Sequence, residues 1–581
     1  MSKTTKPDDS RILSGAEIVW ECLIQEGVEV VFGYPGGANL PIYDALWKYK
    51  EKVHHVLTRH EQNAAHAADG FARASGKVGV AMATSGPGAT NLITGVATAM
   101  MDSIPMICIT GQVGRAALGS DAFQETDILG AMIPVTKHSY QVNDINKLAG
   151  IIKDAFYIAR SGRPGPVLID IPKDVQNESC AFVYPETHNV LPGYNPVVKA
   201  SEDQLVQMAE LINAAKNPVI LAGHGVLLSG ATAELIQLAE TADIPVAVTL
   251  LGIGGIPASH PRCIGFMGMH GGYWVNHAIQ NADLLIACGM RFDDRVTGKL
   301  ETYSPNSKKI HIDIDPTELN KNIIVDVGIR GDLKEVLSAV MPKIVKTKHD
   351  PWTAQIKEWM KISHTKDILN RKSDKLFGAF VVRDLWEATK GNALVVTDVG
   401  QHQMTVAQYY YQDHPNSLLT SGGLGTMGYG VPAAIGASFA GRQEKIWAVV
   451  GDGGIQMTIT ELATAVQEKA NINIALINNG YLGMVRQWQE MFYENRYSET
   501  PISSPDYMKL ADAYGMKGFR VTERKDVIST VLEAQAHEGP TIIEFVVEPM
   551  EMVYPMVATG SALNEMVQRP ITEEQFSDME V

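Results

Sequence analysis

The feature that most constrains this chain is a strand–helix–strand pattern near its C-terminal third. Two apolar runs, 446–450 and 472–477, have the length of buried strands, and the stretch 456–469 between them has helical spacing. Such a unit sets its two strands side by side and parallel, about 4.8 Å apart. Both strands then end at one edge of a sheet, in the crevice where α/β proteins bind ligands.

Polar side chains follow both of these strands. Asp452 stands in the run Gly-Asp-Gly-Gly after the first strand, and Asn479 stands in Asn-Asn-Gly after the second. Each run alone is a common turn. Together they offer two hard oxygens to one cation, and Mg²⁺ takes few protein ligands and a substrate diphosphate for the rest. The flanking glycines let phosphate reach backbone N–H groups at a helix start. We therefore expect a metal–diphosphate site here.

Strand and helix patterns alternate along the whole chain, which predicts an α/β fold of three doubly wound parallel-sheet domains. The expected domains are 11–185, 200–345 and 376–548, followed by a tail, 549–581; residues 184–201 are expected to be a linker and 343–375 a helical connector. The expected strands are 28–32, 53–57, 78–83, 106–109 and 167–171 in the first block, 219–222, 245–249, 284–288 and 309–314 in the second, and 394–397, 446–450, 472–477 and 541–546 in the third.

Composition narrows the class of protein. The net charge of −16 over 581 residues argues against nucleic acid and anionic membranes as partners. The five cysteines show no CxxC or His/Cys cluster, so we expect reduced thiols in a cytoplasmic protein. No apolar run is long enough to span a bilayer. The first ten residues are expected to be a short polar tail and not a signal peptide. A mature organellar form stays open.

A glycine-rich run, Gly423-Leu424-Gly425-Thr426-Met427-Gly428, matches the dinucleotide fingerprint GxGxxG. A Rossmann site also needs a clear strand before the run and an acid ending the next strand. Only the short stretch 417–420 precedes it, and the acid ending the next strand is Asp452. We therefore favour a loop that lets a cofactor approach the backbone over an NAD site.

Glu61 lies in the run Arg-His-Glu-Gln, at the junction between the strand 53–57 and an alanine-rich helix. The simplest interpretation is a glutamate that favours the helix dipole. The alanines at 64, 65, 67, 68 and 72 suit close helix packing. A glutamate buried in such surroundings could instead share a proton with a ring nitrogen.

These motifs, with Thr84–Asn91 (TSGPGATN), resemble the thiamine diphosphate enzymes. Within them, the chain resembles the catalytic subunits of acetohydroxyacid synthase (acetolactate synthase) over nearly its whole length. The further stretches that carry the resemblance are GYPGGA (33–38), DAFQET (121–126), GRPGPV (162–167), PKDV (172–175), RFDDRVTG (291–298) and GMVRQW (483–488). The three blocks would then be pyrimidine-binding, FAD-binding and diphosphate-binding domains.

The resemblance implies a mechanism for joining two 2-ketoacids. Mg²⁺ would be held by the diphosphate, the side chains of Asp452 and Asn479, and the backbone carbonyl of Tyr481. Glu61 would hydrogen-bond the aminopyrimidine ring and promote loss of the thiazolium proton. The cofactor would then decarboxylate pyruvate and transfer the two-carbon unit to pyruvate or 2-ketobutyrate.

The resemblance also assigns further residues. The thiamine cofactor would contact Gly37, Ala38, Pro87, Asn91, Val399, Gly400, Gln401, His402, Gly425, Met427, Gly451, Gly453, Gly454, Leu482, Gly483 and Met484, with Met427 propping its bent shape. Trp488 and Met484 would form the acceptor pocket, Arg295 would face the second substrate's carboxylate, and Gln124 and Lys173 would line the access channel. FAD would contact Arg163, Gly223, Gly225, Thr249, Leu250, Met269, His270, Gly271, Arg291, Asp293, Asp313, Ile314 and Asp332.

For each assignment there is a plainer interpretation. Met427 and Trp488 would be packing residues, and Arg295 and Lys173 would be surface charges. The family further implies a homodimer or a dimer of dimers, with the active site shared by two chains, and a separate small regulatory subunit.

Other functions remain alternatives. They are another thiamine enzyme, such as a pyruvate oxidase or a catabolic acetolactate synthase, an NAD dehydrogenase, and a non-catalytic nucleotide-binding or scaffold protein. Glyoxylate carboligase is disfavoured because its residue at the position of Glu61 is not glutamate. The scaffold alternative predicts loss of Glu61, Asp452 or Asn479, and all three are present.

Overall fold

The computed structural model describes residues 11–196 and 198–570. The predicted N-terminal polar tail, 1–10, and the end of the C-terminal tail, 571–581, lie outside these residues. The chain divides into two compact units, which are described separately. Residues up to 194 together with 423–446 and 456–472 form the first unit, and the other described residues form the second. In the described part of the chain, no helix is long and apolar enough to cross a membrane.

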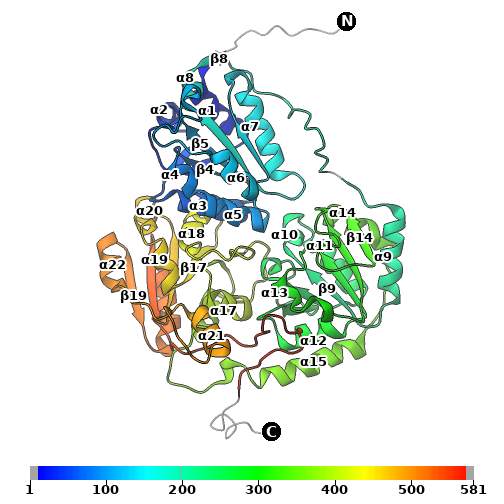
Figure 1. Cartoon of the computed structure of the whole chain (residues 1–581). Coiled ribbons are helices and arrows are strands. Elements are labelled where there is room, and N and C mark those ends of the chain that lie inside the picture. Colours follow the sequence, from blue (N-terminus) through cyan, green and yellow to red (C-terminus); the bar gives the residue numbers. More distant parts are fainter. Residues whose placement is uncertain (1–10, 197, 571–581) are drawn as a thin grey trace. The chain divides into compact units, whose positions relative to one another are not determined.

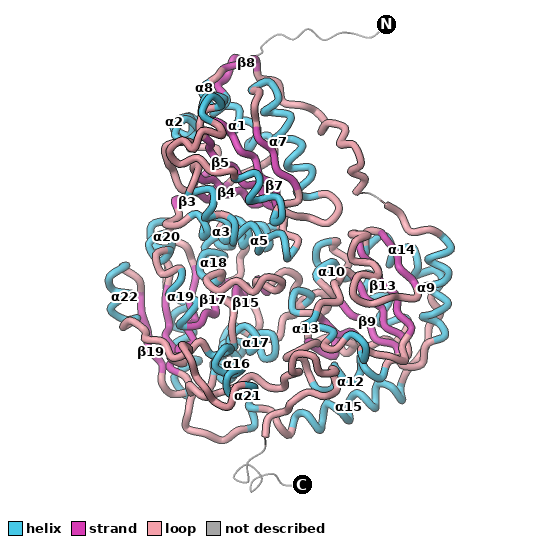
Figure 2. The backbone as a smooth tube through the Cα atoms, viewed as in Figure 1, coloured by secondary structure: helices cyan, strands magenta, loops and turns pink. Residues whose placement is uncertain are grey.

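Three six-stranded sheets organise the chain (Figures 1 and 2), which confirms the predicted α/β class with parallel sheets. The first sheet has the order β3-β2-β4-β5-β7-β6 and belongs to the first unit. Its strands are β2 (Val30–Gly33), β3 (His54–Leu57), β4 (Gly79–Ala83), β5 (Met106–Gln112), β6 (His138–Gln141) and β7 (Pro166–Pro172), all paired in parallel. A small antiparallel pair, β1 (Ile12–Ser14) and β8 (Ser179–Ala181), joins the two ends of this block.

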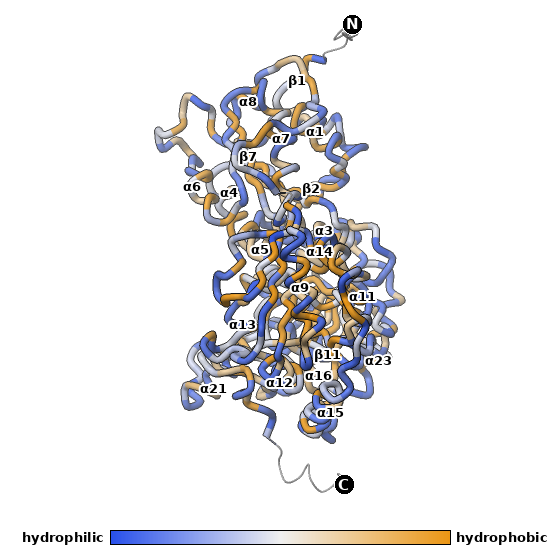
Figure 3. The backbone as a smooth tube through the Cα atoms, turned by 90° about the vertical axis from the view of Figure 1, so that its right-hand side faces the viewer, coloured by the Kyte–Doolittle hydropathy of each residue, from blue (hydrophilic) through white to orange (hydrophobic). Residues whose placement is uncertain are grey.

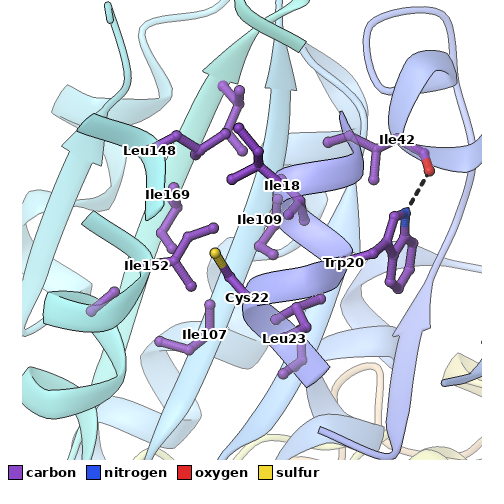
Figure 4. Close-up of a cluster of buried hydrophobic side chains, with 14 of the residues drawn as sticks. Ile18, Trp20, Cys22, Leu23, Ile42, Ile107, Ile109, Leu148, Ile152 and Ile169 are labelled. Carbon is purple, nitrogen blue, oxygen red and sulfur yellow. Dashed lines mark hydrogen bonds between the residues drawn. The ribbon is translucent and has the colours of Figure 1, made fainter. Parts of the chain in front are cut away.

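Helices cover both faces of the first sheet, because its strands are apolar on both sides. Figure 4 shows one face, where Ile107, Ile109 and Ile169 pack against Ile18 of one helix and Ile152 of another. The helices on this face are α1 (Gly15–Gln25), α2 (Leu40–Tyr49) and α7 (Ile145–Arg160). The helices on the other face are α3 (Glu61–Ser75), α4 (Pro87–Asn91), α5 (Ile93–Asp102) and α6 (Ile128–Met132).

Capping explains where several of these helices begin. Ser14 and Glu17 form a reciprocal capping box at the start of α1, and Asp144 caps α7. The buried Trp20 also satisfies its ring N–H, which donates to the carbonyl of Ile42 at 2.7 Å (Figure 4). The first helical layer is therefore fixed by both hydrogen bonds and apolar packing.

The central sheet has the order β11-β10-β9-β12-β13-β14 and lies in the second unit. Its strands are β9 (Pro218–Ala222), β10 (Val246–Val248), β11 (Cys263–Phe266), β12 (Leu284–Cys288), β13 (Lys308–Asp313) and β14 (Val327–Arg330). One face carries α9 (Glu202–Ala214), α10 (His224–Leu228), α11 (Thr232–Thr241) and α14 (Leu333–Val340), and the other carries α12 (Tyr273–Asn281), α13 (Asp294–Thr297) and α15 (Asp350–His364). Figure 3 shows hydrophobic and hydrophilic residues alternating along the amphipathic helices α9 and α11.

The third sheet has the order β16-β15-β17-β18-β20-β19. Its strands are β15 (Ala393–Thr397), β16 (Leu418–Leu419), β17 (Lys445–Gly451), β18 (Ile472–Asn478), β19 (Lys517–Val521) and β20 (Thr541–Val546). The helices of this block are α16 (Gly378–Thr389), α17 (Gln401–Tyr409), α18 (Gly430–Ser438), α19 (Asp452–Met457), α20 (Glu461–Gln467), α21 (Gly483–Phe492), α22 (Tyr507–Tyr514) and α23 (Val527–Ala536). The predicted neighbours β17 and β18 are adjacent. The single helix expected at 456–469 was wrong, since α19 and α20 replace it.

Helices α3 and α18, both in the first unit, cross at backbone contact. A side-chain carbon added to Gly436 would lie 1.8 Å from the carbonyl oxygen of Ala67, and one added to Gly70 would lie 2.1 Å from that of Ala433. Only glycine allows this separation, so the alanine-rich pattern of α3 does mark close packing, as predicted.

Candidate functional site

The ends of β17 and β18 bring Asp452 and Asn479 to one edge of the third sheet. Asp452 is the first residue of α19, and its Oδ2 accepts from the backbone N–H of Gly480 at 2.9 Å. Asn479 Oδ1 accepts from the N–H of Tyr481 at 3.0 Å. The hydrogen bond from Gly480 ties the loop after β18 to the carboxylate that follows β17.

The environment of Asp452 suits a divalent cation. The residue is 2% exposed, and burial raises the pKa of its carboxyl to about 6. A bound cation would compensate the buried negative charge. Among the described residues, no group of three or more His, Cys, Asp or Glu side chains could hold a metal. A carboxylate, an amide oxygen and a backbone carbonyl, completed by a diphosphate, fit Mg²⁺ better than they fit a softer metal.

The loop that begins α17 lies against the same edge. Gln401 Oε1 accepts from Asn479 Nδ2 at 3.2 Å, and Gln401 Nε2 donates to Gln487 Oε1 at 2.9 Å. The imidazole of His402 is buried, which lowers its pKa to about 4 and keeps it neutral. A side chain at Gly451 would come within 2.9 Å of that ring, so glycine is required there. Val399 and Gly400 precede α17, and Gln401 and His402 are its first two residues.

The sequence motifs missed one carboxylate near this edge. Asp398 directly follows β15 and has no exposed surface. A side chain at Gly454 would meet its Oδ1 at 2.5 Å. The apolar run before Asp398 was a usable signal, because an acid directly after a buried strand is the pattern that identified Asp452.

Glu61 occupies the junction that the sequence predicts, as the first residue of α3. Its Oε2 accepts from Asn91 Nδ2, on α4, at 2.9 Å. Glu61 is half-buried, whereas we had expected it to be fully buried. Pro87 begins α4, which places Pro87, Asn91 and Glu61 in one group within the first unit.

Thr84 is a second residue that the assignments missed. Its Oγ1 accepts from the N–H of Ala38 at 3.1 Å, and a side chain at Gly36 would lie 2.5 Å from its methyl group. It therefore holds the Gly37–Ala38 turn beside β4. Its place in the run Thr84–Asn91 was the signal for it.

The two residues expected to line the access channel, Gln124 and Lys173, have different surroundings. Gln124 has a left-handed backbone, with φ of 59°, and its carbonyl oxygen lies 2.7 Å from where a side chain at Gly86 would begin. The loop of Gln124 therefore lies against the start of α4. Lys173 begins α8 (Lys173–Asn177) and is exposed.

The run Gly423–Gly428 is an irregular loop between β16 and α18. The N–H of Gly423 donates to Asp102 Oδ1 at 2.7 Å, and the hydroxyls of Thr426 and Thr98 lie 2.7 Å apart. Gly425 is exposed and has φ of 70°, and Met427 is half-buried. Met427 is therefore not a fully buried core residue.

Arg295, Met269 and Trp488 lie together in the second unit. The guanidinium of Arg295 lies 5.9 Å from the centre of the Trp488 ring, and its Nη1 lies 3.4 Å from Met269 Sδ. Met484 stands one turn before Trp488 on α21, which begins at Gly483 after Leu482. Trp488 is half-buried, so it is not a simple core residue.

The expected flavin contacts of the second unit follow the ends of the central strands. Gly223 and Gly225 follow β9, Thr249 and Leu250 follow β10, Met269, His270 and Gly271 follow β11, Arg291 and Asp293 follow β12, Asp313 ends β13 and Ile314 follows it, and Asp332 follows β14. Asp293 and Asp332 cap α13 and α14. Burial lowers the pKa of His270 to about 4 and raises that of Asp293. Arg163 belongs to the first unit, where its Nε donates to Ser103 at 2.8 Å.

Three family models match the chain. They describe the N-terminal thiamine pyrophosphate-binding domain (residues 13–131), the central domain (205–340) and the C-terminal thiamine pyrophosphate-binding domain (398–545) of thiamine pyrophosphate enzymes.

Curated relatives match over nearly the full length. The acetolactate synthase of Mycobacterium bovis is 46% identical over 95% of this chain and 91% of its own. The acetolactate synthase isozyme 3 large subunit of Escherichia coli is 44% identical over 96% of this chain and 98% of its own. The acetolactate synthase large subunit of Corynebacterium glutamicum is 45% identical over 97% and 92%. The chain therefore belongs to the thiamine pyrophosphate enzymes and, within them, to the acetolactate synthase large subunits.

Proposed function

We propose that this chain decarboxylates pyruvate and joins the two-carbon unit to a second 2-ketoacid, pyruvate or 2-ketobutyrate. The product would be 2-acetolactate or 2-aceto-2-hydroxybutyrate, at the first common step of branched-chain amino-acid biosynthesis. The observation that carries the proposal is the desolvated acid–amide edge in the second unit, where buried Asp452 follows β17 and Asn479 follows β18. Glu61, held by Asn91 in the first unit, is the second group that the reaction needs. The full-length similarity to acetolactate synthases supports it.

Thiamine diphosphate would supply the carbanion that attacks a ketone and the electron sink that lets CO₂ leave. The residues of the chain would bind and orient it. Asp452, Asn479 and the carbonyl of Tyr481 would hold Mg²⁺ against the diphosphate, and Gln401 would orient Asn479. Glu61, held by Asn91, would exchange a proton with the pyrimidine ring. Met427 would support the cofactor from the Gly423–Gly428 loop.

The acceptor 2-ketoacid would lie beside the Arg295–Trp488 pair. Arg295 provides a cation for its carboxylate, and Trp488 with Met484 provides apolar surface for its side chain. Gln124 and Lys173 would line the approach. One methylene in such a pocket is worth about 1–3 kcal/mol, which limits the preference between 2-ketobutyrate and pyruvate.

We further propose FAD at the carboxyl ends of the central strands. Gly223 and Gly225 let the loop after β9 pack directly against the backbone of Gly289. Asp313 ends β13, where an acid can bind ribose. The reaction has no net redox change, so FAD would be structural. The three domains would be 11–185, 200–345 and 376–548.

We propose a homodimer as the smallest active unit, with Glu61 of one chain serving the Asp452 edge of another. Relatives named as large subunits support a separate small regulatory subunit. Dilution tests the dimer, because a demonstrated monomer with full activity would contradict it.

The decisive experiment is a product assay with pyruvate alone and with added 2-ketobutyrate. Thiamine diphosphate, Mg²⁺ and FAD are omitted in turn from protein stripped of all three. We expect acetolactate from pyruvate alone, a second hydroxyacid when 2-ketobutyrate is added, and loss of both products without any one cofactor. Acetyl phosphate or acetate in place of acetolactate would identify a pyruvate oxidase instead.

A further inference from the structure

Helix α20 lies against the junction between β3 and α3 at which Glu61 stands (Figure 1). Both parts belong to the first unit. The first residue of α20 is Glu461, which has no part in the site described above, and only 1% of it is exposed. An acid that served only the dipole of its own helix would gain nothing from burial, because taking a charge out of water is costly. The dipole alone therefore does not explain why Glu461 is buried.

Both oxygens of this carboxylate accept hydrogen bonds. Oε1 of Glu461 accepts from the backbone N–H of Arg59 at 2.7 Å and from Asn63 Nδ2 at 3.0 Å. Oε2 accepts from the hydroxyl of Thr464, three residues further along α20, at 2.7 Å. None of these three donors carries a charge. Buried charges are usually paired with charges of the opposite sign, and departures from that rule are expected at functional positions.

The two bonds to Oε1 flank Glu61. Arg59 lies two residues before Glu61 and Asn63 lies two residues after it, and Asn63 is itself buried. The start of α3 therefore cannot slide or rotate relative to α20 without breaking one of the two bonds. The side chain of Glu61 has a different partner, Asn91, whose Nδ2 donates to its Oε2 at 2.9 Å. Glu461 thus fixes the backbone that carries Glu61, and Asn91 fixes the carboxylate.

Other residues on the same side of α20 also bond to this junction. The hydroxyl of Thr464 lies 3.3 Å from the carbonyl oxygen of Leu57, the last residue of β3. Gln467 Oε1 accepts from Arg59 Nη2 at 2.9 Å. Glu461, Thr464 and Gln467 are three residues apart, so they share one side of the helix. Of these three, Glu461 alone bonds on both sides of Glu61.

We propose that Glu461 is a positioning residue for Glu61: its carboxylate holds the start of α3 in the place from which Glu61 exchanges a proton with the cofactor ring. The inference rests on the function proposed above, because that function gives Glu61 its catalytic role.

The first experiment compares three variants by steady-state kinetics. Glu461→Met keeps the length of the side chain and removes both bonds, and kcat should fall at least about tenfold, since a misplacement of about 1 Å can cost about 10²-fold. The KM for pyruvate and the affinity for thiamine diphosphate with Mg²⁺ should stay within about twofold. Glu461→Gln keeps an oxygen for both bonds and should restore kcat to within about threefold. Glu468→Met, which removes a carboxylate at the end of α20 that bonds His54, is the control and should leave kcat unchanged.

A second measurement needs neither cofactor nor turnover. Amide hydrogen exchange of the cofactor-free chain reports the bond from the N–H of Arg59 directly. Exchange within residues 58–64 should be at least about tenfold faster in Glu461→Met and unchanged in Glu461→Gln, while α7 keeps its protection in both. Unchanged exchange at 58–64 in Glu461→Met would overturn the proposal. A lower Tm with unchanged kcat would also overturn it, because Glu461 would then only stabilise the fold.

A double-mutant cycle tests whether Glu461 acts through Glu61. Glu461→Met should cause no further loss of kcat in the Glu61→Gln background, because the group that it positions is already lost. Losses that multiply in the double variant would contradict the assignment. Asn63→Ala removes only one of the two bonds, so it keeps the test valid if Glu461→Met does not fold. It should lower kcat about threefold with unchanged cofactor affinity, and an unchanged kcat there would also contradict the assignment.

Failure of the proposed function gives a different result. Exchange of the thiazolium C2 proton with deuterated solvent, in protein loaded with thiamine diphosphate and Mg²⁺ but without pyruvate, measures the proton loss assigned to Glu61. If this exchange is normal and no acetolactate forms from pyruvate, the proposed function is wrong, and slower exchange in Glu461→Met still supports the positioning role. If Glu61→Gln leaves the exchange unchanged, the role of Glu61 is wrong and the inference about Glu461 fails with it.

Discussion

Asp452 and Glu61 are two carboxylates with the same local position and different surroundings. Each is the first residue of a helix that follows a parallel strand. Asp452 is 2% exposed, accepts from a backbone N–H, and has a pKa raised to about 6 by burial. Glu61 is half-buried and accepts from a side-chain amide. A fixed, desolvated carboxylate suits a bound cation, whereas a partly open one can exchange a proton with a ligand.

The largest effect should come from Glu61→Gln. Glutamine keeps an oxygen for Asn91 but cannot exchange the proton, so kcat should fall about 10²–10⁴-fold. The affinity for thiamine diphosphate should change little. Steady-state rates and a cofactor titration measure both quantities, with Glu51→Gln, at an exposed glutamate, as the control. Turnover close to that of the unmodified enzyme would show that Glu61 only favours the helix dipole.

Asp452→Ala should give the opposite pattern. Removing a ligand should weaken Mg²⁺-dependent binding of thiamine diphosphate at least about a hundredfold, since even indirect partners of a metal are worth 10–100-fold. Calorimetry with and without Mg²⁺ measures this, and Asp350→Ala, at an exposed aspartate that begins α15, is the control. An unchanged affinity for thiamine diphosphate would show that Asp452 is only a turn residue and that its role does not differ from that of Glu61 in the way proposed.

Gly436→Ala tests whether the two carboxylates depend on different packing. The added carbon would meet a backbone oxygen 1.8 Å away, so α18 must shift from α3, the helix of Glu61. We expect a loss of about 1–3 kcal/mol in stability, seen as a lower Tm, and a lower kcat with little change in Mg²⁺ affinity. Gly150→Ala, within α7 and with its nearest neighbour 3.4 Å away, should be neutral or stabilising. If Gly436→Ala lowered the Mg²⁺ affinity as much as it lowered kcat, Glu61 and Asp452 would not depend on different packing.

Trp488→Leu should change specificity without affecting either carboxylate. The smaller side chain should reduce the preference for 2-ketobutyrate over pyruvate by up to about 1–3 kcal/mol. Competition between the two acceptors, with the products quantified, measures the ratio. Phe492→Leu, one turn further along α21 and in contact with the Trp488 ring, is the matched control. An unchanged product ratio would leave Trp488 as a packing residue.

The smallest effect concerns an exposed pair in the first unit, His54 and Glu468. Their hydrogen bond of 2.8 Å raises the pKa of His54 and lowers that of Glu468. The stabilisation is therefore complete below the ordinary pKa of histidine, near 6.5, and is lost as pH rises through the raised value. A double-mutant cycle with alanine should give about 0.2–1 kcal/mol at pH 6 and nothing at pH 9. Coupling that persists at pH 9 would contradict the assignment.

Buried strands and the residues that follow them were predictable from sequence. The strands β4, β12, β17 and β18 are buried on both faces of their sheets. Each is therefore a continuous apolar run, which can be recognised from the local sequence alone. Asp452, Asn479 and Glu61 were placed correctly because each stands directly at a strand end or a helix start.

Edge strands and side-chain partners were not predictable in the same way. The predicted strands did not include β6, β11, β14 and β19, which are all edge strands with partly exposed residues. The break between α19 and α20 places Glu461 where it accepts from Arg59 and Asn63 at 2.7 and 3.0 Å. Those partners are some 400 positions away in sequence, so no local pattern shows them. Thr84 and Asp398 each follow a buried strand directly, which was a usable signal. Their contacts with Ala38 and Gly454 come from distant segments and could not be predicted.

The close contact between α3 and α18 at Gly70 and Gly436 also limits how the sequences of the two helices can change during evolution. Because the two backbones are in contact, neither helix can rotate or slide without moving the other. Glu61 at the start of α3 and Met427 in the loop before α18 are therefore positioned by the same helix pair. Whether one helix tolerates a substitution then depends on the residues of the other helix that face it. Grafting α3 alone from a relative should fail more often than exchanging both helices together.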